Sequence, residues 1–440
     1  MVIKFNGERA FKDLESLAVE IGTRPSGSDR EKDAAKWVAS QFEALGLTTE
    51  IQEFEVTTGR VVSQSLKVIE PYEDEVRCEM MPLYGSTGLE GVKGELIHID
   101  SLDEENLNPG IAGKVILTPG RSKDAKKTFK LLARWKPLAL IYIESSPRVL
   151  AKNLWGSPIV KDRYGEFPTL RISYLDGLKL LESQATKVHV IAESEVIKVK
   201  SQNVIGELKG TERPDEIVVI GGHYDTVLEV PGAGDNAGGT AITIELARIF
   251  KEKGTKRTMR FVAWGAEELG LLGSRDYATK LREASEAAKK EDENEDQTEL
   301  DRTMLCINLD VQGGYIGTNV SNVLGASDLK SAVKLLSKET GIVFTVNEGV
   351  SSTDSTPLSA VGVPSVSFSR NTPPNQFMHS VEDDLKWLNH QALQSQGAFV
   401  EEFLTRYVAN AAAFPFEKTI PEKQKKDIED YFKRSMRKPP

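Results

Sequence analysis

The chain has 440 residues, a length typical of about two to three domains around a large buried core. Its formal net charge of -10 argues against a surface built mainly to bind nucleic-acid phosphates or an anionic membrane. Only two cysteines are present, Cys78 and Cys306, which is too few for a disulfide framework or a cysteine-based zinc site. We therefore expect a folded protein with reduced cysteines in its core.

The N-terminal segment, residues 1–11, lacks the apolar stretch of a signal peptide. No stretch of the chain reaches the roughly 18 uninterrupted apolar residues that a membrane span needs. We therefore expect a cytoplasmic protein that acts without a membrane or nucleic-acid partner. Homo-oligomer formation is left open.

The first 47 residues are predicted to form two helices. The second helix begins at Ser28, which has capping-box spacing to Glu31, and it ends before Gly46. An alternating segment over residues 49–56 then predicts a strand. The first helix carries an apolar stripe at Phe11, Leu14, Leu17, Ala18 and Ile21.

The middle and the end of the chain differ in their pattern of apolar runs and of the residues that separate these runs. Residues 60–193 contain short β-like runs separated by Gly, Pro and Asp, which indicates an inserted, strand-rich domain. Buried strands then alternate with helices, a pattern typical of an α/β domain with a mixed, largely parallel central sheet flanked by helices. We expect residues 1–59 and 194–416 to form this discontinuous domain, and residues 417–440 to form a charged C-terminal tail.

Histidine and acidic side chains follow four of the predicted buried strands. Ligands of open α/β sheets bind at the carboxyl ends of the strands, where such side chains converge. Residues of these types at four strand ends predict a metal site. They are His223 after strand 217–220, Glu267 and Glu268 after strand 261–264, Asp310 after strand 305–309, and His379 after strand 366–368.

A fifth element, the glycine-rich segment 232–239, carries Asp235 and leads into a helix. Glycines let the backbone approach a metal centre closely, and a carboxylate there could bridge two ions. Two divalent ions about 3.5–4 Å apart can share a water, lower its pKa and clamp the substrate oxygen. With Asp235 shared, the ligand pairs could be His223 with Asp310, and Glu268 with His379, which leaves each zinc an open position.

The remaining acids suggest supporting roles. Glu267, next to a metal ligand, could take a proton from the water between the ions and return it to a leaving amine. Asp225 lies two residues beyond His223 and could orient its imidazole, and Asp383 could do the same for His379. The chemistry expected of such a site is metal-assisted hydrolysis of an amide.

With these residues in place, the chain resembles the M28 family of co-catalytic zinc peptidases, which includes aminopeptidases and glutamate carboxypeptidases. The resemblance covers roughly residues 10 to 410. It is carried by Gly-Gly-His223-Tyr-Asp225, Gly234-Asp235-Asn-Ala-Gly-Gly239, Trp264-Gly-Ala-Glu267-Glu268-Leu-Gly270, Ile307-Asn-Leu-Asp310 and His379-Ser-Val-Glu-Asp383, and by Gly22-Thr-Arg-Pro-Ser-Gly-Ser28.

The resemblance implies a zinc-exopeptidase fold and a site with two Zn²⁺ ions, for which Co²⁺ or Mn²⁺ could substitute. It implies the ligand pairs given above, Asp235 as the bridging ligand and Glu267 as the general base. Residues 60–193 resemble a protease-associated (PA) insert. The sequence departs from many relatives at Asp384, where they have Thr, and this adds a carboxylate near the site. The remaining histidines, His98, His189 and His390, are expected to be structural.

The function we expect is that of an aminopeptidase that removes N-terminal residues from short peptides. The substrate amine would face acids such as Glu267 and Asp310, with Asp354 as a further candidate. A glutamate-carboxypeptidase-like enzyme is an alternative, for which Arg370 is the best candidate to clamp a free carboxylate. Within the enzyme class, a glutaminyl cyclase also competes with the aminopeptidase. A non-catalytic binding protein that keeps the fold is a hypothesis from a different class.

Overall fold

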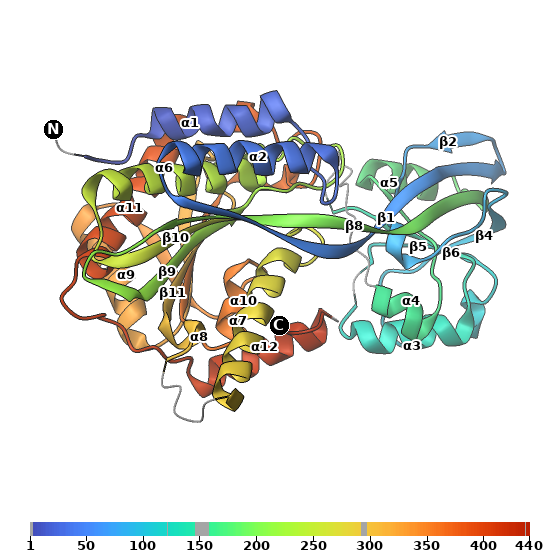
Figure 1. Cartoon of the computed structure of the whole chain (residues 1–440). Coiled ribbons are helices and arrows are strands. Elements are labelled where there is room, and N and C mark those ends of the chain that lie inside the picture. The colour runs from blue at the N-terminus through green and yellow to red at the C-terminus, as the bar shows by residue number, and fades with distance from the viewer. Residues whose placement is uncertain (1–2, 121, 146–157, 292–296, 436) are drawn as a thin grey trace. The chain divides into compact units, whose positions relative to one another are not determined.

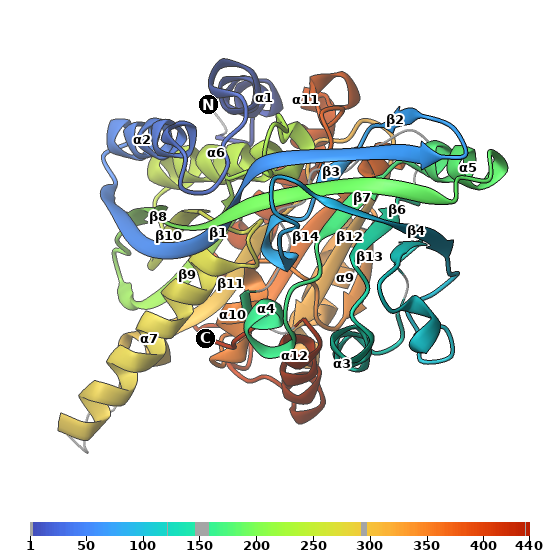
Figure 2. The same cartoon turned by 90° about the vertical axis from the view of Figure 1, so that its right-hand side faces the viewer.

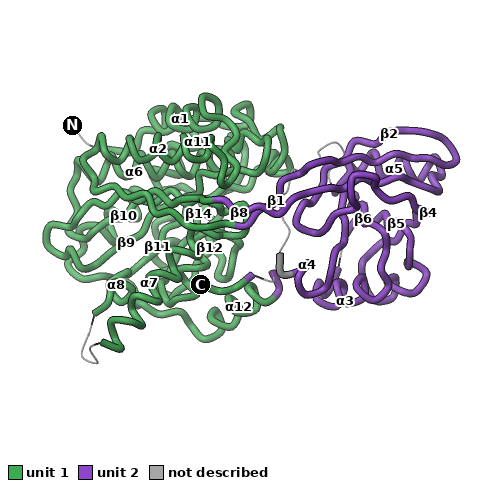
Figure 3. Tube along the Cα trace, turned by 45° about the vertical axis from the view of Figure 1, so that its right-hand side comes forward, with its two compact units in different colours: residues 1–56, 200–433, 438–440 green, residues 57–199, 434–437 purple. Residues whose placement is uncertain are grey.

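The computed structural model of the chain describes residues 3–120, 122–145, 158–291, 297–435 and 437–440. The chain divides into two compact units, the first made of residues 1–56, 200–433 and 438–440, the second of residues 57–199 and 434–437 (Figure 3). Two long strands, β1 (Thr48–Glu70) and β8 (Lys187–Leu208), pass from one unit into the other. Among the described helices, none combines the length and the apolar character that a membrane-spanning segment needs.

The first unit is built on a mixed sheet whose four central strands are parallel. The neighbouring strands β10, β9, β11 and β14 all run in the same direction, whereas β8 and β12 pair with this group in antiparallel fashion. This arrangement confirms the predicted fold class. In spatial order the strands are β13 (Phe344–Glu348), β12 (Thr318–Leu324), β14 (Ser365–Asn371), β11 (Thr303–Leu309), β9 (Arg213–His223), β10 (Arg257–Trp264) and β8.

The central strands bury both of their faces, which explains why they read as continuous apolar runs. On β9, Val218 and Ile220 belong to one core cluster, whereas Ile217 and Val219 belong to another on the opposite face. Helices therefore cover both sides of the sheet (Figure 1, Figure 2). One side carries α1 (Gly7–Glu15), α2 (Asp29–Ala44), α6 (Gly238–Lys253), α9 (Ser327–Thr340) and α11 (His390–Phe403), and the other carries α7 (Leu272–Glu291) and α10 (Ser355–Ala360).

The N-terminal helices form as predicted, with one difference in the cap of α2. Ser28 accepts the amide of Glu31 at 3.0 Å, and the helix ends just before Gly46, which has a φ of 68°. The Glu31 carboxylate does not return to Ser28, as a capping box would require. It accepts the amide of Gly27 at 2.6 Å and the hydroxyl of Ser201 at 2.6 Å, because the side chain is fully buried against the sheet.

The second unit contains helices as well as strands. Its strands β4 (Val92–His98), β5 (Val115–Thr118), β6 (Ala139–Ile143) and β7 (Thr169–Ile172) are parallel, and β3 (Glu79–Met80) and β8 pair with the two ends of this group in antiparallel fashion. Short strand β2 (Asp74–Val76) pairs with β1. The strand-rich texture of this segment does not predict its helices, α3 (Ala125–Trp135), α4 (Pro158–Tyr164) and α5 (Tyr174–Glu182).

The C-terminal segment forms helix α12 (Glu422–Arg434), where the sequence predicts only a charged tail. Its apolar side chains Ile428 and Phe432 are buried in a small cluster with Leu324 and Ile420. The Gln424 side chain accepts the amide of Gly325 at 2.8 Å and donates to its carbonyl at 3.2 Å. The helix is charged on its outer face but packs against the sheet unit through its inner face.

Candidate metal centre

The predicted site residues follow four strands that are adjacent and parallel. The register pairs His223 at the end of β9 with Trp264 at the end of β10, and Leu309 at the end of β11 with Phe368 on β14. The carboxyl ends of these strands therefore meet at one edge of the sheet, where the loops that follow them converge.

Two groups of potential metal ligands share this edge. The first is His223, Asp235 and Asp310, and the second is Asp235, Glu268 and His379. Within each group, the ligand atoms lie within 4.8 Å of one another. His223 Nε2 is 3.0 Å from Asp235 Oδ1 and 3.5 Å from Asp310 Oδ1. His379 Nε2 is 3.3 Å from Asp235 Oδ2 and 3.1 Å from Glu268 Oε2.

Asp235 is the residue common to both groups, and its two carboxylate oxygens face different histidines. Oδ1 faces His223, whereas Oδ2 faces His379. Asp235 is 5% exposed, so both oxygens are directed into the site and not to solvent. This is the geometry that a carboxylate bridging two ions requires.

Asp225 contacts both the histidine before it and the acidic pair after β10. Its Oδ1 is 3.5 Å from His223 Nδ1, whose nearest acceptor is the Asp225 carbonyl oxygen at 3.2 Å. The same carboxylate accepts the amides of Glu267 at 3.0 Å and Glu268 at 3.2 Å. Ser26 donates its hydroxyl to Oδ2 at 2.9 Å. Asp225 therefore fixes the turn that carries the two glutamates as well as the imidazole.

Asp383 supports the loop that carries Asp235, in addition to lying near His379. Its carboxylate oxygens accept the amides of Gly234 at 3.0 Å and Asp235 at 3.1 Å, and its carbonyl accepts the amide of Ala233. Its contact with His379 is electrostatic. Proximity in sequence to His379 suggested a local partner, but the loop that carries Asp235 lies closer in space.

Non-glycine residues in the left-handed region surround the site. Ala266 precedes the two glutamates with a φ of 52°, Val311 follows Asp310 with a φ of 57°, and His379 itself has a φ of 61°. Each such residue costs about 1–3 kcal/mol, so the surrounding packing must hold it in place. In the turn after β10, the residue with left-handed backbone is Ala266, although the glycine before it, Gly265, would adopt that conformation more easily. Gly265 is needed for space, since a Cβ there would lie 2.4 Å from the carbonyl oxygen of Gln202.

The charges of the cluster perturb one another. Burial alone would raise the pKa of Asp235, but hydrogen bonds with His223 and His379 hold the pKa below its usual range. Although burial opposes their charging, the surrounding carboxylates raise the pKa of both histidines well above the usual value. Removal from water, together with nearby acids including Glu268, raises the pKa of Glu267 well above its ordinary value. The carboxylates around the two histidines concentrate negative charge, which bound cations would compensate.

The donor set fits zinc. Each group offers one imidazole nitrogen and two carboxylates, which are ordinary zinc ligands, and three protein ligands leave an open position for water or substrate. No other group of this kind occurs among the residues that the structure describes. His98, His189 and His390 take no part in either group, and the two cysteines are unpaired and buried as predicted.

The chain is similar in sequence to known peptidases. Residues 203–404 match the family described as Peptidase family M28. We call residues 203–404 the M28-like segment. Aminopeptidase YwaD from Bacillus subtilis is 26% identical over 98% of this chain and 90% of its own length.

Solved structures share the fold of the whole chain. The zinc aminopeptidase BSAP of Bacillus subtilis matches with a TM-score of 0.75 and 23% identity, over 96% of this chain and all of that one. The M28 peptidase precursor of Shewanella amazonensis matches with a TM-score of 0.78 and 21% identity, over 94% of this chain and 96% of that one.

Arg24 connects the N-terminal segment to the M28-like segment, a role that the sequence did not reveal. This arginine is fully buried and donates only to carbonyl oxygens, at distances from 2.5 to 3.1 Å. The acceptors are Leu17, Gly22, Tyr224, Pro231 and Gly232. Three of these lie just before Asp235 in the chain. The motif over residues 22–28 was the only signal that could have pointed to it.

Two other residues suggested by the sequence make hydrogen bonds within the protein. The guanidinium of Arg370 donates to the carbonyl oxygens of Gly314 at 2.6 Å and Tyr315 at 3.3 Å, and to Asn319 Oδ1 at 2.6 Å. Three of the five N–H groups of its guanidinium are thus engaged within the protein. Asp354 is fully buried, and its Oδ1 accepts the hydroxyl of Ser274 at 2.6 Å.

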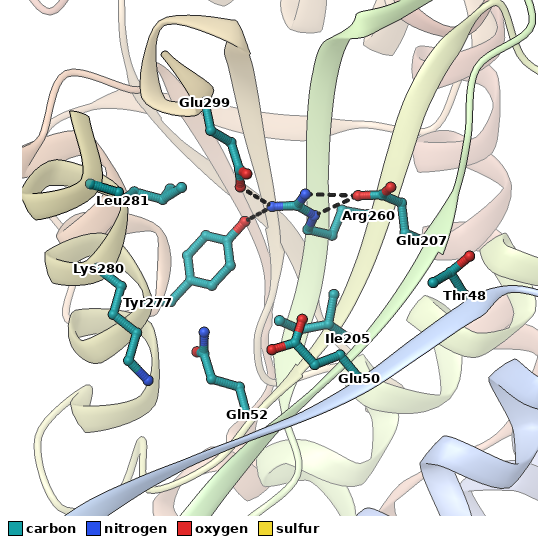
Figure 4. A pocket seen from close by; sticks show the side chains of 11 residues that line it. Thr48, Glu50, Gln52, Ile205, Glu207, Arg260, Tyr277, Lys280, Leu281 and Glu299 are labelled. Atoms are coloured by element: carbon teal, nitrogen blue, oxygen red, sulfur yellow. Dashed lines mark hydrogen bonds and ion pairs between the residues drawn. The ribbon is translucent and has the colours of Figure 1, made fainter. Parts of the chain in front are cut away.

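The same unit also has a pocket of about 440 Å³ (Figure 4). None of its lining residues belongs to either ligand group. Its central cation, Arg260, is bound by Glu207 at 2.7 Å, Glu299 at 2.6 Å and the hydroxyl of Tyr277 at 2.6 Å. The charge of Arg260 is thus already neutralised, and the second lining cation, Lys280, pairs with Asp276 at 2.7 Å.

Proposed function

We propose that the chain is a zinc-dependent aminopeptidase that removes N-terminal residues from short peptides, with two metal ions bound in one site. The observation that carries this proposal is the Asp235 carboxylate, whose two oxygens face His223 and His379 separately. His223 and Asp310 would hold one ion, Glu268 and His379 the other, and Asp235 both.

Bound divalent ions would supply a Lewis acid for the scissile carbonyl and a water of lowered pKa. Glu267 lies next to the candidate ligand Glu268, belongs to neither ligand group and is partly exposed, whereas Asp225 is fully buried. As general base, its carboxylate takes a proton from the attacking water and delivers it to the nitrogen of the leaving amine. Asp225 holds this carboxylate in place through the Glu267 amide.

An aminopeptidase is favoured over a carboxypeptidase by the charges around the centre. A free N-terminal ammonium group would be attracted to a site rich in carboxylates, whereas a C-terminal carboxylate needs a cation. The candidate for that cation, Arg370, is engaged with Gly314, Tyr315 and Asn319. The name of the Bacillus subtilis relative, an aminopeptidase, points the same way.

A panel of one peptide with free and blocked ends tests the choice. Loss of cleavage on N-acetylation, with cleavage retained on C-amidation, supports the aminopeptidase. The reverse result supports the carboxypeptidase. If neither form is cleaved while metal is bound, the exopeptidase function is wrong and a non-catalytic role takes its place.

We also propose that residues 60–193 are an inserted domain of the protease-associated type. The support is that residues 57–199 form a compact unit with core clusters of their own. A cooperative thermal transition of the isolated unit would support an independent domain, and an unfolded fragment would contradict it. The cytoplasmic location stays a prediction.

A further inference from the structure

Asn236 follows the bridging candidate Asp235 in the chain and has no assigned role. Its side chain is fully buried. The carboxamide makes three hydrogen bonds, all to main-chain groups. Nδ2 donates to the carbonyl oxygen of Leu309 at 2.8 Å, while Oδ1 accepts the amides of Val311 at 3.2 Å and Gly239 at 3.0 Å.

The two partners on β11 and its turn lie on either side of Asp310. One planar carboxamide therefore holds the backbone both before and after this ligand. The same residue is joined through its own backbone to Asp235. The backbone segments that carry the two carboxylates of the His223 group, 75 positions apart in sequence, are thus joined by the side chain of Asn236. A main-chain hydrogen bond from the Gln312 amide to the Gly234 carbonyl oxygen, at 3.3 Å, joins the same two segments.

The surroundings leave room for this side chain only because residue 239 is a glycine. A Cβ at Gly239 would lie 2.2 Å from the Leu309 carbonyl oxygen and 2.5 Å from Asn236 Oδ1. The start of α6 can then pack directly on the end of β11. Val311, held by Asn236 through its amide, also accepts the amide of Arg370 at 2.9 Å, which helps to keep its left-handed turn.

The pattern of partners requires an amide and not an acid. One side of the group faces an acceptor, the Leu309 carbonyl, and the other faces two donors. Aspartate would place an oxygen against the Leu309 carbonyl and add a buried negative charge beside Asp235 and Asp310. Leaving such buried main-chain groups without partners is costly, so the turn would shift.

We propose that Asn236 is a positioning residue that sets the separation of the Asp235 and Asp310 carboxylates, and thereby the affinity for the ion shared by His223 and these two acids. The proposal rests on the proposed two-ion function. The second ligand group receives its support elsewhere, because Asp383 holds the Asp235 amide and Asp225 holds the Glu268 amide.

The test is a zinc titration of the metal-free full-length chain by calorimetry. Changes around metal ligands typically cost tenfold to a hundredfold in metal affinity. For Asn236→Asp and Asn236→Ala we expect one ion to bind about tenfold to a hundredfold more weakly, while the other keeps nearly its wild-type affinity. The matched control is Asn308→Ala, since Asn308 is equally buried on β11 but donates to Ser367 Oγ at 3.2 Å. This control should keep both affinities.

Double variants that combine Asn236→Asp with a substitution of a proposed ligand identify the ion whose affinity is lowered. Asn236→Asp combined with Asp310→Asn should cost little more than Asp310→Asn alone, because both act on one ion. Combined with Glu268→Gln, it should weaken both ions. Thermal unfolding of each metal-free variant shows whether it folds, and Asn236→Ala provides the uncharged second variant.

The outcomes separate the two proposals. If the wild type binds two ions and the Asn236 variants bind both with unchanged affinity, or lose both equally, the role of Asn236 is wrong and the proposed function stands. If the wild-type chain binds fewer than two ions, the proposed function fails and this proposal fails with it.

Discussion

Glu267 is the residue on which the proposed chemistry depends most. Its amide is held by Asp225, and its side chain lies outside both ligand groups. General acid-base groups contribute about 10²–10⁴-fold to enzyme rates. We expect Glu267→Gln to lower kcat on an aminoacyl-anilide by about this factor while two zinc ions stay bound. Steady-state kinetics with metal analysis of the same sample measures both, and a variant that cleaves as fast as wild type would show that Glu267 is not the base.

Glu31 makes stability depend on pH. Burial, and then the charge of Asp225, raise the pKa of its carboxyl from 4.5 to about 8. Between these values the folded chain binds a proton that the unfolded chain has released, so this group makes the free energy of unfolding fall as pH rises from about 4.5 to 8. Below pH 4.5 its stabilising contribution is complete, and above pH 8 it is lost.

Glu31→Gln removes this titration. The melting temperature of the variant relative to wild type should therefore rise steadily between pH 5 and pH 9, by an amount equivalent to a few kcal/mol. Differential scanning calorimetry of the metal-free protein measures the melting temperatures. The control is Glu43→Gln, because Glu43 lies on the same helix and is exposed. A constant difference across this range would contradict the shifted pKa.

At the scale of elements, the segment over residues 22–28 fastens the loop that carries Asp235. Arg24 holds carbonyl oxygens of Tyr224, Pro231 and Gly232 in that loop. Lysine has three donors at a single point and cannot reproduce a planar fork with five N–H groups. Arg24→Lys would therefore leave at least two of the five carbonyl oxygens, three of them buried and two partly buried, without this donor, at about 1–3 kcal/mol for each buried one.

We expect Arg24→Lys to lower the free energy of unfolding by at least about 2 kcal/mol and to weaken zinc binding as well. Urea denaturation and zinc titration measure the two effects. The exposed Arg30, changed to Lys, is the matched control and should alter neither. Wild-type stability in Arg24→Lys would mean that the carbonyls find other donors.

Helix α12 is a second element whose packing can be tested. Phe432 is 2% exposed in the cluster with Leu324 and Ile420. Phe432→Ala should cost about 3–5 kcal/mol if α12 unfolds together with the rest of its unit. The exposed neighbour Lys433, changed to Ala, should cost well under 1 kcal/mol. Denaturant unfolding measures the free energy of unfolding of both variants. Equal values for the two variants would mean that α12 detaches without destabilising the rest of its unit.

At the scale of the whole molecule, the sequence was sufficient to predict the central sheet and the gathering of the ligand residues. The strands β9, β10, β11 and β14 are buried on both faces and read as apolar runs, and a side chain that follows such a strand has its place set by the topology. Strand β13 and its neighbour β12 carry Asn, Ser and exposed positions, so no periodic apolar pattern marks them.

The contacts that support the site could not be predicted in this way. Arg24 meets its loop acceptors about 200 positions away, and Asp383 meets Asp235 148 positions away. Such pairs depend on how loops pack after the sheet has formed, and no local periodicity encodes them. For the same reason the sequence pairs Asp383 with His379, its neighbour along the chain, instead of with Asp235.

The proposed enzyme depends above all on two metal ions held in one site. The most direct test removes all metal with a chelator and returns zinc in steps, following bound zinc per chain and hydrolysis of an aminoacyl-anilide together. We expect chelation to abolish activity, and activity to saturate when two ions are bound per chain. Full activity without metal, or saturation with a single bound ion, would contradict the two-ion site.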